Sequence, residues 1–170
     1  MTDAADATNA YVFHAEGRAD GRTLAFVFHG TGGSENQFVP LVRELMPSAA
    51  IIAPRGDVSE RGALRFFRRS GEGQYDMADL EKRTAAMAAF IEEHVAAAQP
   101  AEVCGLGYSN GANLHGAILQ LYPDAVQQAV LLRGLQVLED APQLAPDALA
   151  GHRGFTALDP FHPARDEGPC

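Results

Sequence analysis

The stretch Ala101-Glu-Val-Cys-Gly-Leu-Gly107-Tyr-Ser-Asn-Gly111 gives the strongest indication of how this chain folds. Residues 101–107 form an apolar run with the length of a buried strand. Residues 110–121 have the pattern of a helix, which Pro123 closes. A strand that turns directly into a helix through Gly-x-Ser-x-Gly is typical of an α/β protein, with the turn at the edge of a parallel sheet.

Strands and helices alternate on both sides of this unit. The expected elements are strands over 11–14, 23–28, 49–53 and 129–132 and helices over 34–46 and 76–98. Ser34 is the expected N-cap of the first helix, although Pro40 is also compatible with a later start. Residues 57–75 are expected to form a loop. The alternation predicts a three-layer α/β fold with a mostly parallel sheet, as one domain over residues 11–170 after a flexible N-terminus, residues 1–10.

Ser109 is the candidate nucleophile. On a sharp strand-to-helix turn its hydroxyl would lie at the sheet edge, and the glycines on either side, Gly107 and Gly111, would leave room for close packing of backbone and helix. The N-terminus of the following helix would offer N–H groups to a developing negative charge. The alternative is a glycine-rich turn with a purely structural role.

A second motif, His29-Gly-Thr-Gly-Gly33, follows an earlier strand, where a second donor for an oxyanion would be expected. The backbone N–H of Thr31 would be that donor, paired with the N–H of Asn110. His29 is expected to order this loop and not to act as a base. The alternative is a phosphate-binding loop, but the motif has neither the lysine of a P-loop nor the Gly-x-Gly-x-x-Gly spacing.

With these two motifs in this order, the chain resembles the α/β-hydrolase fold, in the phospholipase/carboxylesterase group of small serine esterases. That group includes acyl-protein thioesterases and proteins named hydroquinone-pathway hydrolases. The likeness extends over residues 11–138 and rests on His29-Gly-Thr-Gly-Gly33, Ala53-Pro-Arg-Gly56, Arg65-Phe-Phe-Arg-Arg69, Gly107-Tyr-Ser-Asn-Gly-Ala-Asn113, Tyr122-Pro123 and Ala129-Val-Leu-Leu-Arg133.

The resemblance implies esterase or thioesterase chemistry on a small-molecule substrate, without metal or cofactor. It also implies that residues 65–69 lie near the mouth of the active site. The substrate-binding residues expected from it are His29, Gly30, Gly32, Arg65 and Phe66. Taken alone, residues 65–69 are equally compatible with a surface loop that carries a half-buried aromatic pair.

The C-terminal part departs from the pattern of that group, whose members continue through an acid turn to a later Gly-His turn with the catalytic histidine. Here Thr156-Ala-Leu-Asp-Pro160 resembles the acid turn, which makes Asp159 the candidate acid. The chain stops at Cys170, before the usual histidine position, so the last elements of the fold are expected to be shortened or missing. His162 follows Asp159 and is the candidate base; the alternative is a solvent-exposed tail histidine. Of the other histidines, His94 is expected to be solvated.

Composition narrows the class of partner. Thirteen basic and twenty-two acidic residues give a formal charge of −9, which disfavours binding to nucleic acid or to an anionic membrane surface. No apolar stretch approaches the ~20 residues of a membrane span, and no signal-peptide pattern is evident. The two cysteines form no disulfide framework. A cytoplasmic protein is therefore expected.

These patterns predict a serine hydrolase that cleaves carboxylic esters or thioesters through an acyl-serine intermediate. A second interpretation is a catalytically impaired hydrolase-like protein that binds a ligand or partner through the same pocket. A third is a fragment of marginal stability. Without the final strands of the fold, the strand over 129–132 would lie near an unpaired sheet edge, so a homo-oligomer is expected.

Overall fold

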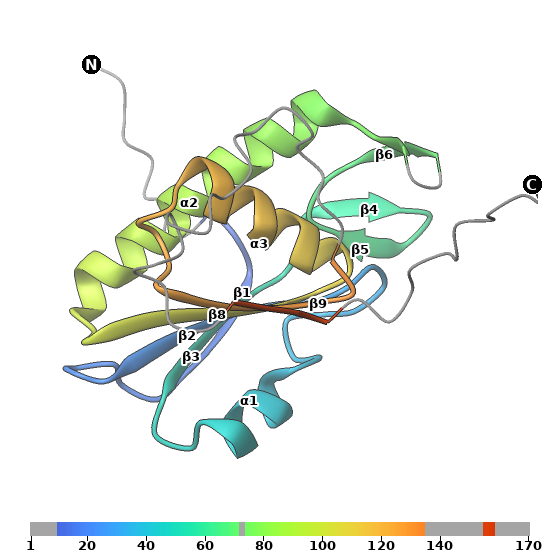
Figure 1. Ribbon diagram of the computed structural model, residues 1–170. Helices are drawn as coiled ribbons and strands as arrows, with labels where there is room; N and C mark the ends of the chain where they lie inside the picture. Colours follow the sequence, from blue (N-terminus) through green and yellow to red (C-terminus); the bar gives the residue numbers. More distant parts are fainter. Residues whose placement is uncertain (1–9, 72–73, 135–154, 159–170) are drawn as a thin grey trace, which may run out of the picture.

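A six-stranded, mostly parallel sheet forms the centre of the computed structural model, which describes residues 10–71, 74–134 and 155–158 (Figure 1). Its strands are, in spatial order, β1 (Phe13–Glu16), β3 (Ala50–Pro54), β2 (Thr23–Phe28), β8 (Glu102–Tyr108), β9 (Gln128–Leu132) and β10 (Phe155–Leu158). Only β1 pairs antiparallel, with β3, and every other pairing in this sheet is parallel. The predicted α/β fold with a mostly parallel sheet is confirmed.

Helices cover both faces of the sheet. Helices α2 (Met77–Ala98) and α3 (Asn110–Leu121) lie on one face, and α1 (Val39–Leu45) lies on the other (Figure 1). Of the two starts that the sequence allowed for α1, the later one is confirmed, and Ser34 is not its N-cap. The helix begins at Val39 with Pro40 in its first turn, because proline has no N–H to donate and suits a position where that donor would be unpaired.

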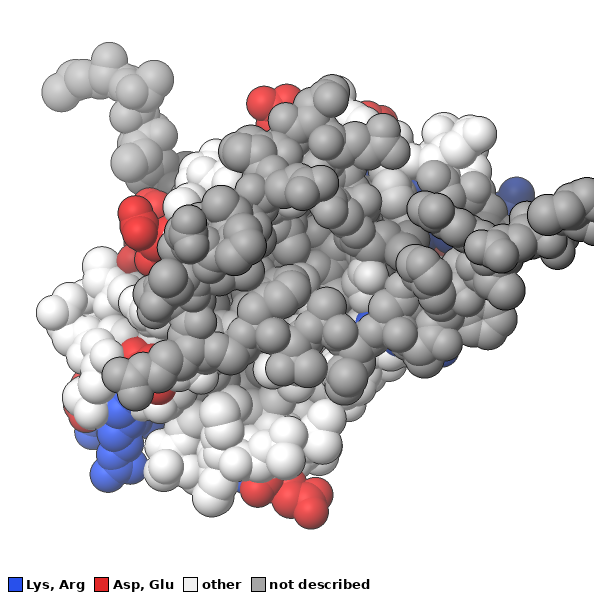
Figure 2. Space-filling view, viewed as in Figure 1, with Lys and Arg blue, Asp and Glu red and all other residues white. Residues whose placement is uncertain are grey.

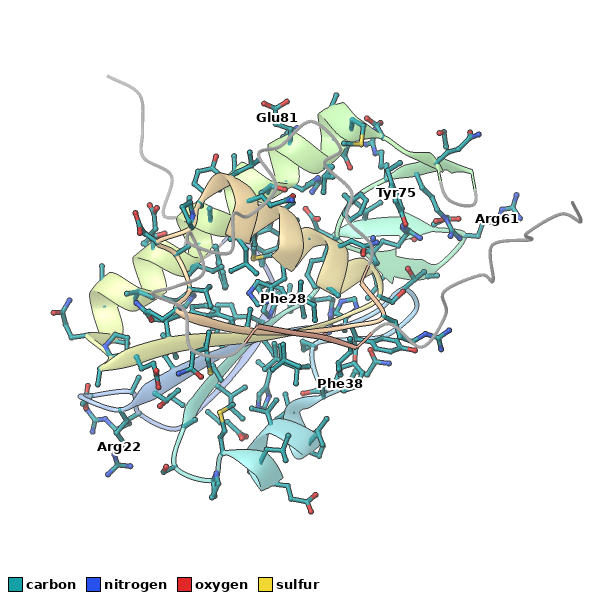
Figure 3. All side chains as sticks on the ribbon, in the orientation of Figure 1. Arg22, Phe28, Phe38, Arg61, Tyr75 and Glu81 are labelled. Atoms are coloured by element: carbon teal, nitrogen blue, oxygen red, sulfur yellow. The ribbon has the colours of Figure 1, made fainter. Side chains whose placement is uncertain are left out.

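The core is divided by the sheet into two layers. The larger layer lies between the sheet and α2 and α3, and it contains Phe28. The smaller lies toward α1, with Phe38 packed against it. Figure 3 shows Phe28 and Phe38 on opposite sides of the sheet. Both faces of the central strands are covered, and these strands are therefore continuous apolar runs.

Two short hairpins occupy residues 57–75, where a loop was expected. One pairs β4 (Val58–Glu60) with β5 (Ala63–Arg65), and the other pairs β6 (Arg69–Gly71) with β7 (Gln74–Tyr75). The expectation failed because strands of two or three residues are too short to show an alternating apolar pattern. The turn of the first hairpin has Arg61 at φ +51° and Gly62 at φ +87°, and Figure 3 shows the Arg61 side chain pointing away from the fold.

Strand β10 extends the sheet beyond β9. The two strands pair in parallel from Phe155 opposite Ala129 to Leu158 opposite Leu132. The strand expected near an unpaired edge thus has a neighbour on each side, and the outermost strand of the described sheet is β10.

The charged side chains that are visible in Figure 2 form no single basic area. Acidic and basic groups lie there in small, separate clusters near the periphery. Within the described part of the chain, no helix is both long and apolar enough to cross a bilayer.

Candidate functional site

Ser109 lies on a strained turn at the C-terminal end of β8. Its φ of +51° and ψ of −115° belong to a region that L-amino acids rarely adopt. The turn is held on both sides, since the Ser109 N–H donates to the Leu132 carbonyl at 2.8 Å and the Asn113 N–H donates to the Ser109 carbonyl at 2.9 Å. Ser109 thus immediately precedes the N-terminus of the twelve-residue helix α3.

The glycines on either side of this serine are packed against backbone. A Cβ on Gly107 would lie 2.8 Å from the Cα of Ala112, and a Cβ on Gly111 would lie 2.4 Å from the carbonyl oxygen of His29. The close approach expected of these glycines is therefore present. It also brings the start of α3 against the end of β2, where the second motif begins.

His29 organises the loop that follows β2. Its Nε2 accepts a hydrogen bond from the Gly56 N–H at 2.9 Å, so the proton of the neutral ring is on Nδ1, which donates to the Gly30 carbonyl at 2.7 Å. Burial lowers the pKa of His29, which favours this neutral form. Both ring nitrogens are engaged, as expected for a histidine that orders the loop; direct contact with a substrate stays a prediction.

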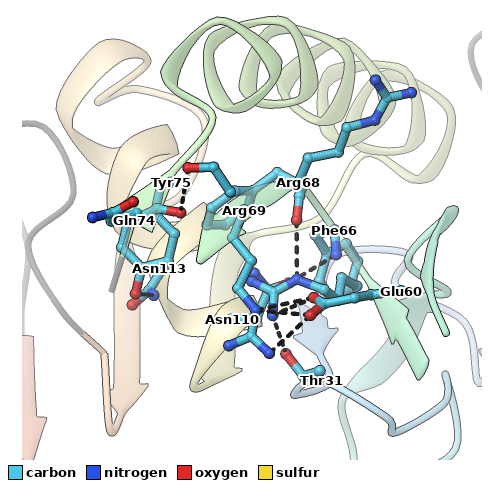
Figure 4. Close-up of polar contacts among 12 residues, drawn as sticks. Thr31, Glu60, Phe66, Arg68, Arg69, Gln74, Tyr75, Asn110 and Asn113 are labelled. Carbon is cyan, nitrogen blue, oxygen red and sulfur yellow. Dashed lines mark hydrogen bonds and ion pairs between the residues drawn. The ribbon is translucent and has the colours of Figure 1, made fainter. Parts of the chain in front are cut away.

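Residues 64–66 connect this loop to the start of α3. The Gly32 N–H donates to the Leu64 carbonyl at 2.9 Å, and Nη1 of Arg65 donates to Oγ1 of Thr31 at 3.1 Å. The Phe66 N–H donates to Oδ1 of Asn110 at 2.7 Å (Figure 4). The structure therefore brings together Thr31 and Asn110, the two residues predicted to supply oxyanion donors.

Arg65 and Phe66 are both buried, with exposed fractions of 2 % and 1 %. The interpretation of this part as a surface loop with a half-buried aromatic pair is therefore wrong for residues 65–67. Burial lowers the pKa of Arg65, and the carboxylate of Glu60, 3.3 Å from its Nη1, opposes that shift. Whether Arg65, Phe66, Gly30 and Gly32 contact a substrate stays a prediction.

The other described histidines pack against residues other than Ser109. His14 contacts Glu16 at 3.1 Å, and His94, expected to be solvated, packs against three aromatic rings, the nearest being Phe90 at 4.4 Å. His94 departs from expectation because the last turns of α2 lie over the sheet, and burial lowers its pKa. His115 is fully buried, and burial lowers its pKa to about 3.

Asp159 and His162, the predicted acid and base, lie outside the described residues. The strand β10 ends at Leu158, one position before Asp159 in the chain. Within residues 10–71 and 74–134, no group of three His, Cys, Asp or Glu side chains is arranged to hold a metal ion.

The sequence interpretation missed polar side chains that support the site. Asn110 was noted only for its backbone, yet its side chain bonds to Phe66. Asn113, one turn further along α3, donates to the hydroxyl of Tyr75 at 3.3 Å. Arg55 forms a bidentate pair with Glu35, just after the glycine-rich loop, with Nε 2.7 Å from Oε2. Two asparagines three apart at a buried helix start are the one signal that could have indicated such contacts.

Comparison with known proteins agrees with this geometry. A protein of unknown function from Agrobacterium tumefaciens is 45% identical, with a TM-score of 0.75, over 78% of this chain and 65% of its own. A carboxylesterase from Mesorhizobium loti is 34% identical, with a TM-score of 0.72, over 78% of this chain and 65% of its own. MhqD of Bacillus subtilis, which carries a provisional hydrolase name, is 37% identical over 122 residues, 67% of this chain and 61% of its own.

No family model matches the chain. The chain spans less than two thirds of the length of the relatives named above. The parallel sheet, the turn at Ser109 and these likenesses define an α/β-hydrolase fold. Among proteins of that fold, the chain is similar to carboxylesterases and to a provisionally named hydrolase.

Proposed function

We propose that this protein is a serine hydrolase that cleaves carboxylic esters or thioesters. The observation that carries the proposal is the strained backbone of Ser109, at φ +51°, directly before α3 and beside the loop after β2. Backbone strain of this kind persists where the surrounding structure enforces it, and it is concentrated at functional sites. The carboxylesterase relatives give the reaction class.

In the proposed reaction, Ser109 Oγ attacks the acyl carbon while its proton passes to a general base. The C–O or C–S bond to the leaving group then breaks, and the base returns the proton to the departing alcohol or thiol. Water repeats the sequence on the acyl-serine and releases the acid. The N–H groups of Thr31 and Asn110 stabilise the oxyanion, and the partial positive charge at the start of α3 favours it.

His162 is the proposed base and Asp159 the acid that orients it. The support for this pair is its place in the sequence, directly after a strand that lies parallel to β9. If His162 accepts the proton, activity rises with pH through about 6.5, the ordinary range of histidine. His162→Ala should then remove that rise. An unchanged rate and pH profile in His162→Ala would exclude it as the base.

The direct test is labelling with a fluorophosphonate probe, which reacts only with an activated serine. We expect wild type to be labelled and to hydrolyse a short activated acyl ester, and Ser109→Ala to do neither while keeping its fold. Ser48→Ala, in an exposed turn after α1, is the matched control and should behave as wild type. Equal turnover in wild type and Ser109→Ala would contradict the assignment. A wild type that neither reacts with the probe nor turns over ester would favour a binding protein without catalysis.

A further inference from the structure

We propose that Arg65 and the side chain of Asn110 are positioning residues that fix the spacing between the two oxyanion donors. They act through residues 64–66, a segment that bonds to both donor-bearing parts of the chain (Figure 4). This inference rests on the proposed function and adds to it residues that do not themselves touch the substrate.

On one side, the segment fixes the conformation of the loop around Thr31. The Thr31 hydroxyl accepts from Nη1 of Arg65 at 3.1 Å, and the next N–H, that of Gly32, donates to the Leu64 carbonyl at 2.9 Å. These two hydrogen bonds restrain rotation of the peptide group that joins Thr31 to Gly32. The Thr31 N–H, one peptide earlier, is therefore held in a defined direction.

On the other side, the segment fixes the first residue of α3. The Phe66 N–H donates to Oδ1 of Asn110 at 2.7 Å, and Asn110 is only 3 % exposed. Three consecutive residues thus bridge the loop after β2 and the start of α3. Any movement of one donor relative to the other has to distort at least one of these bonds.

Burying Arg65 costs free energy, because a buried guanidinium loses its hydration. Its side chain is 3 % exposed, and its Nε donates to the Phe67 carbonyl at 3.1 Å. Glu60 lies 3.3 Å from Nη1 and is itself held by Arg69 at 3.0 Å. Gly56 packs against the same residue so closely that a Cβ there would lie 2.4 Å from the Arg65 carbonyl oxygen. The guanidinium of Arg65 is planar and its N–H donors have fixed directions, so it can bind several acceptors at once.

Such positioning should affect turnover more than substrate binding. An oxyanion donor acts only when it lies about 2.7–3.1 Å from the oxygen that becomes negative in the transition state. A donor that is displaced but still present loses part of that stabilisation. The ground state, in which the oxygen is not yet charged, is affected little.

The test compares Thr31→Val with Thr31→Ser. Valine keeps the shape and the backbone N–H but removes the acceptor of the Arg65 bond, whereas serine keeps the acceptor. We expect Thr31→Val to lower kcat and the rate of fluorophosphonate labelling about 10-fold, with KM within about two-fold, less than the 10²–10³ of a wholly lost donor. Thr31→Ser should recover most of that loss.

Thr84→Val is the matched control, because it removes a buried hydroxyl that donates to Leu80 at 2.7 Å on α2, away from this site. It should lose stability without losing kcat. A second arm is Asn110→Leu, which removes the acceptor of Phe66. Its effect combined with Thr31→Val should be less than additive, because both changes release the same segment.

The outcomes separate this inference from the proposed function. Labelling of wild type with an unchanged kcat in Thr31→Val overturns the inference alone. Equal losses in Thr31→Val and Thr31→Ser, or fully additive effects with Asn110→Leu, also overturn it. A wild type that is not labelled at Ser109 overturns the proposed function and this inference together.

Discussion

Gly111 shows how a single missing side chain shapes this site. A Cβ there would lie 2.4 Å from the His29 carbonyl oxygen and 2.6 Å from the Phe28 carbonyl oxygen, both rigid backbone atoms. The start of α3 would have to move away from β2 to accept it. The same approach brings Asn110 beside the loop that carries Thr31, so packing and proposed chemistry depend on the same contact.

We therefore expect Gly111→Ala to lower the free energy of unfolding by about 1–3 kcal/mol, the cost of overpacking, and to abolish activity. Gly116→Ala is the matched control on the same helix, because among the residues that the structure describes its Cβ would meet only Leu131 Cδ1, at 3.6 Å. It should gain up to about 1 kcal/mol, since alanine favours the helix. Urea unfolding and ester hydrolysis measure both effects. Equal stability of the two variants would contradict this account.

At the scale of elements, the loop after β2 depends on one left-handed residue. Gly32 has φ +78°, and the nearest described atom to a Cβ there would be Ala63 Cβ at 3.9 Å, an ordinary van der Waals contact. The residue type at position 32 is therefore restricted by the backbone conformation and not by the space available for a side chain. An L-residue would be strained or would rotate the adjacent peptide, which carries the N–H bonded to Leu64.

A pair of substitutions separates strain from function. Gly32→Ala and Gly21→Ala should each cost about 1 kcal/mol of stability, because Gly21 also has a positive φ, of +67°. No atom in the described part of the chain would lie within 4 Å of a Cβ at Gly21. Only Gly32→Ala should lower kcat, since Gly21 lies in the turn before β2. Thermal unfolding and turnover of both variants provide the measurement. Loss of turnover in both, or in neither, would mean that the loop does not control the oxyanion donor.

At the scale of the whole molecule, a buried, unpaired histidine makes stability depend on pH. Neither ring nitrogen of His115 has a hydrogen-bond partner among the described residues, and burial lowers its pKa from 6.5 to about 3. Between these values the unfolded chain binds a proton on this ring and the folded chain does not. The free energy of unfolding therefore falls as pH falls below 6.5, by about 1.4 kcal/mol per pH unit for this one group.

His115→Leu should remove that contribution. When the pH is lowered from about 7.5 to about 5.5, the free energy of unfolding of the variant should therefore fall by about 1 kcal/mol less than that of wild type. Some loss should remain, because burial also lowers the pKa values of His29 and His94. Urea unfolding at the two pH values tests this. Parallel losses in wild type and variant would mean that His115 is protonated in the folded state.

The whole molecule is also expected to self-associate. A groove of about 160 Å³ between α1 and strands β2, β8 and β9 is lined mostly by apolar side chains, among them Leu45, Cys104 and Val130. Leu45 is 65 % exposed. The charge of −9 opposes association, so added salt should promote it by screening. Sedimentation at low and high salt is the measurement. A monomer under both conditions, with a single sharp unfolding transition, would contradict the expectation.

Local patterns predicted the features of this fold that depend on neighbours in the sequence. The apolar runs gave the strands, and the spacing around Ser109 gave the turn, because glycines at fixed positions permit close packing. The sequence left two starts of α1 open, and Pro40 marks the observed one. The hairpins over residues 57–75 were missed, because their strands have only two or three residues.

Contacts between distant side chains could not be read from the sequence. The burial of Arg65 and its bond to Thr31 arise only when β5 lies beside the loop after β2. Likewise, a helix-end position indicated a solvated His94, but the ring contacts of Phe13 and Phe26 depend on the packing of α2 across the sheet.

The bridge made by residues 64–66 also implies an order of assembly during folding. The Thr31–Arg65 bond joins residues 34 apart and the Phe66–Asn110 bond joins residues 44 apart in the chain. Closing such long loops costs conformational entropy that a few hydrogen bonds cannot offset before the surrounding sheet has formed. The pairing of β2 with β8 has to come first, because it brings the loop and α3 to the same sheet edge. The site is therefore among the last parts of the molecule to form, and recovery of turnover follows recovery of secondary structure when the chain refolds.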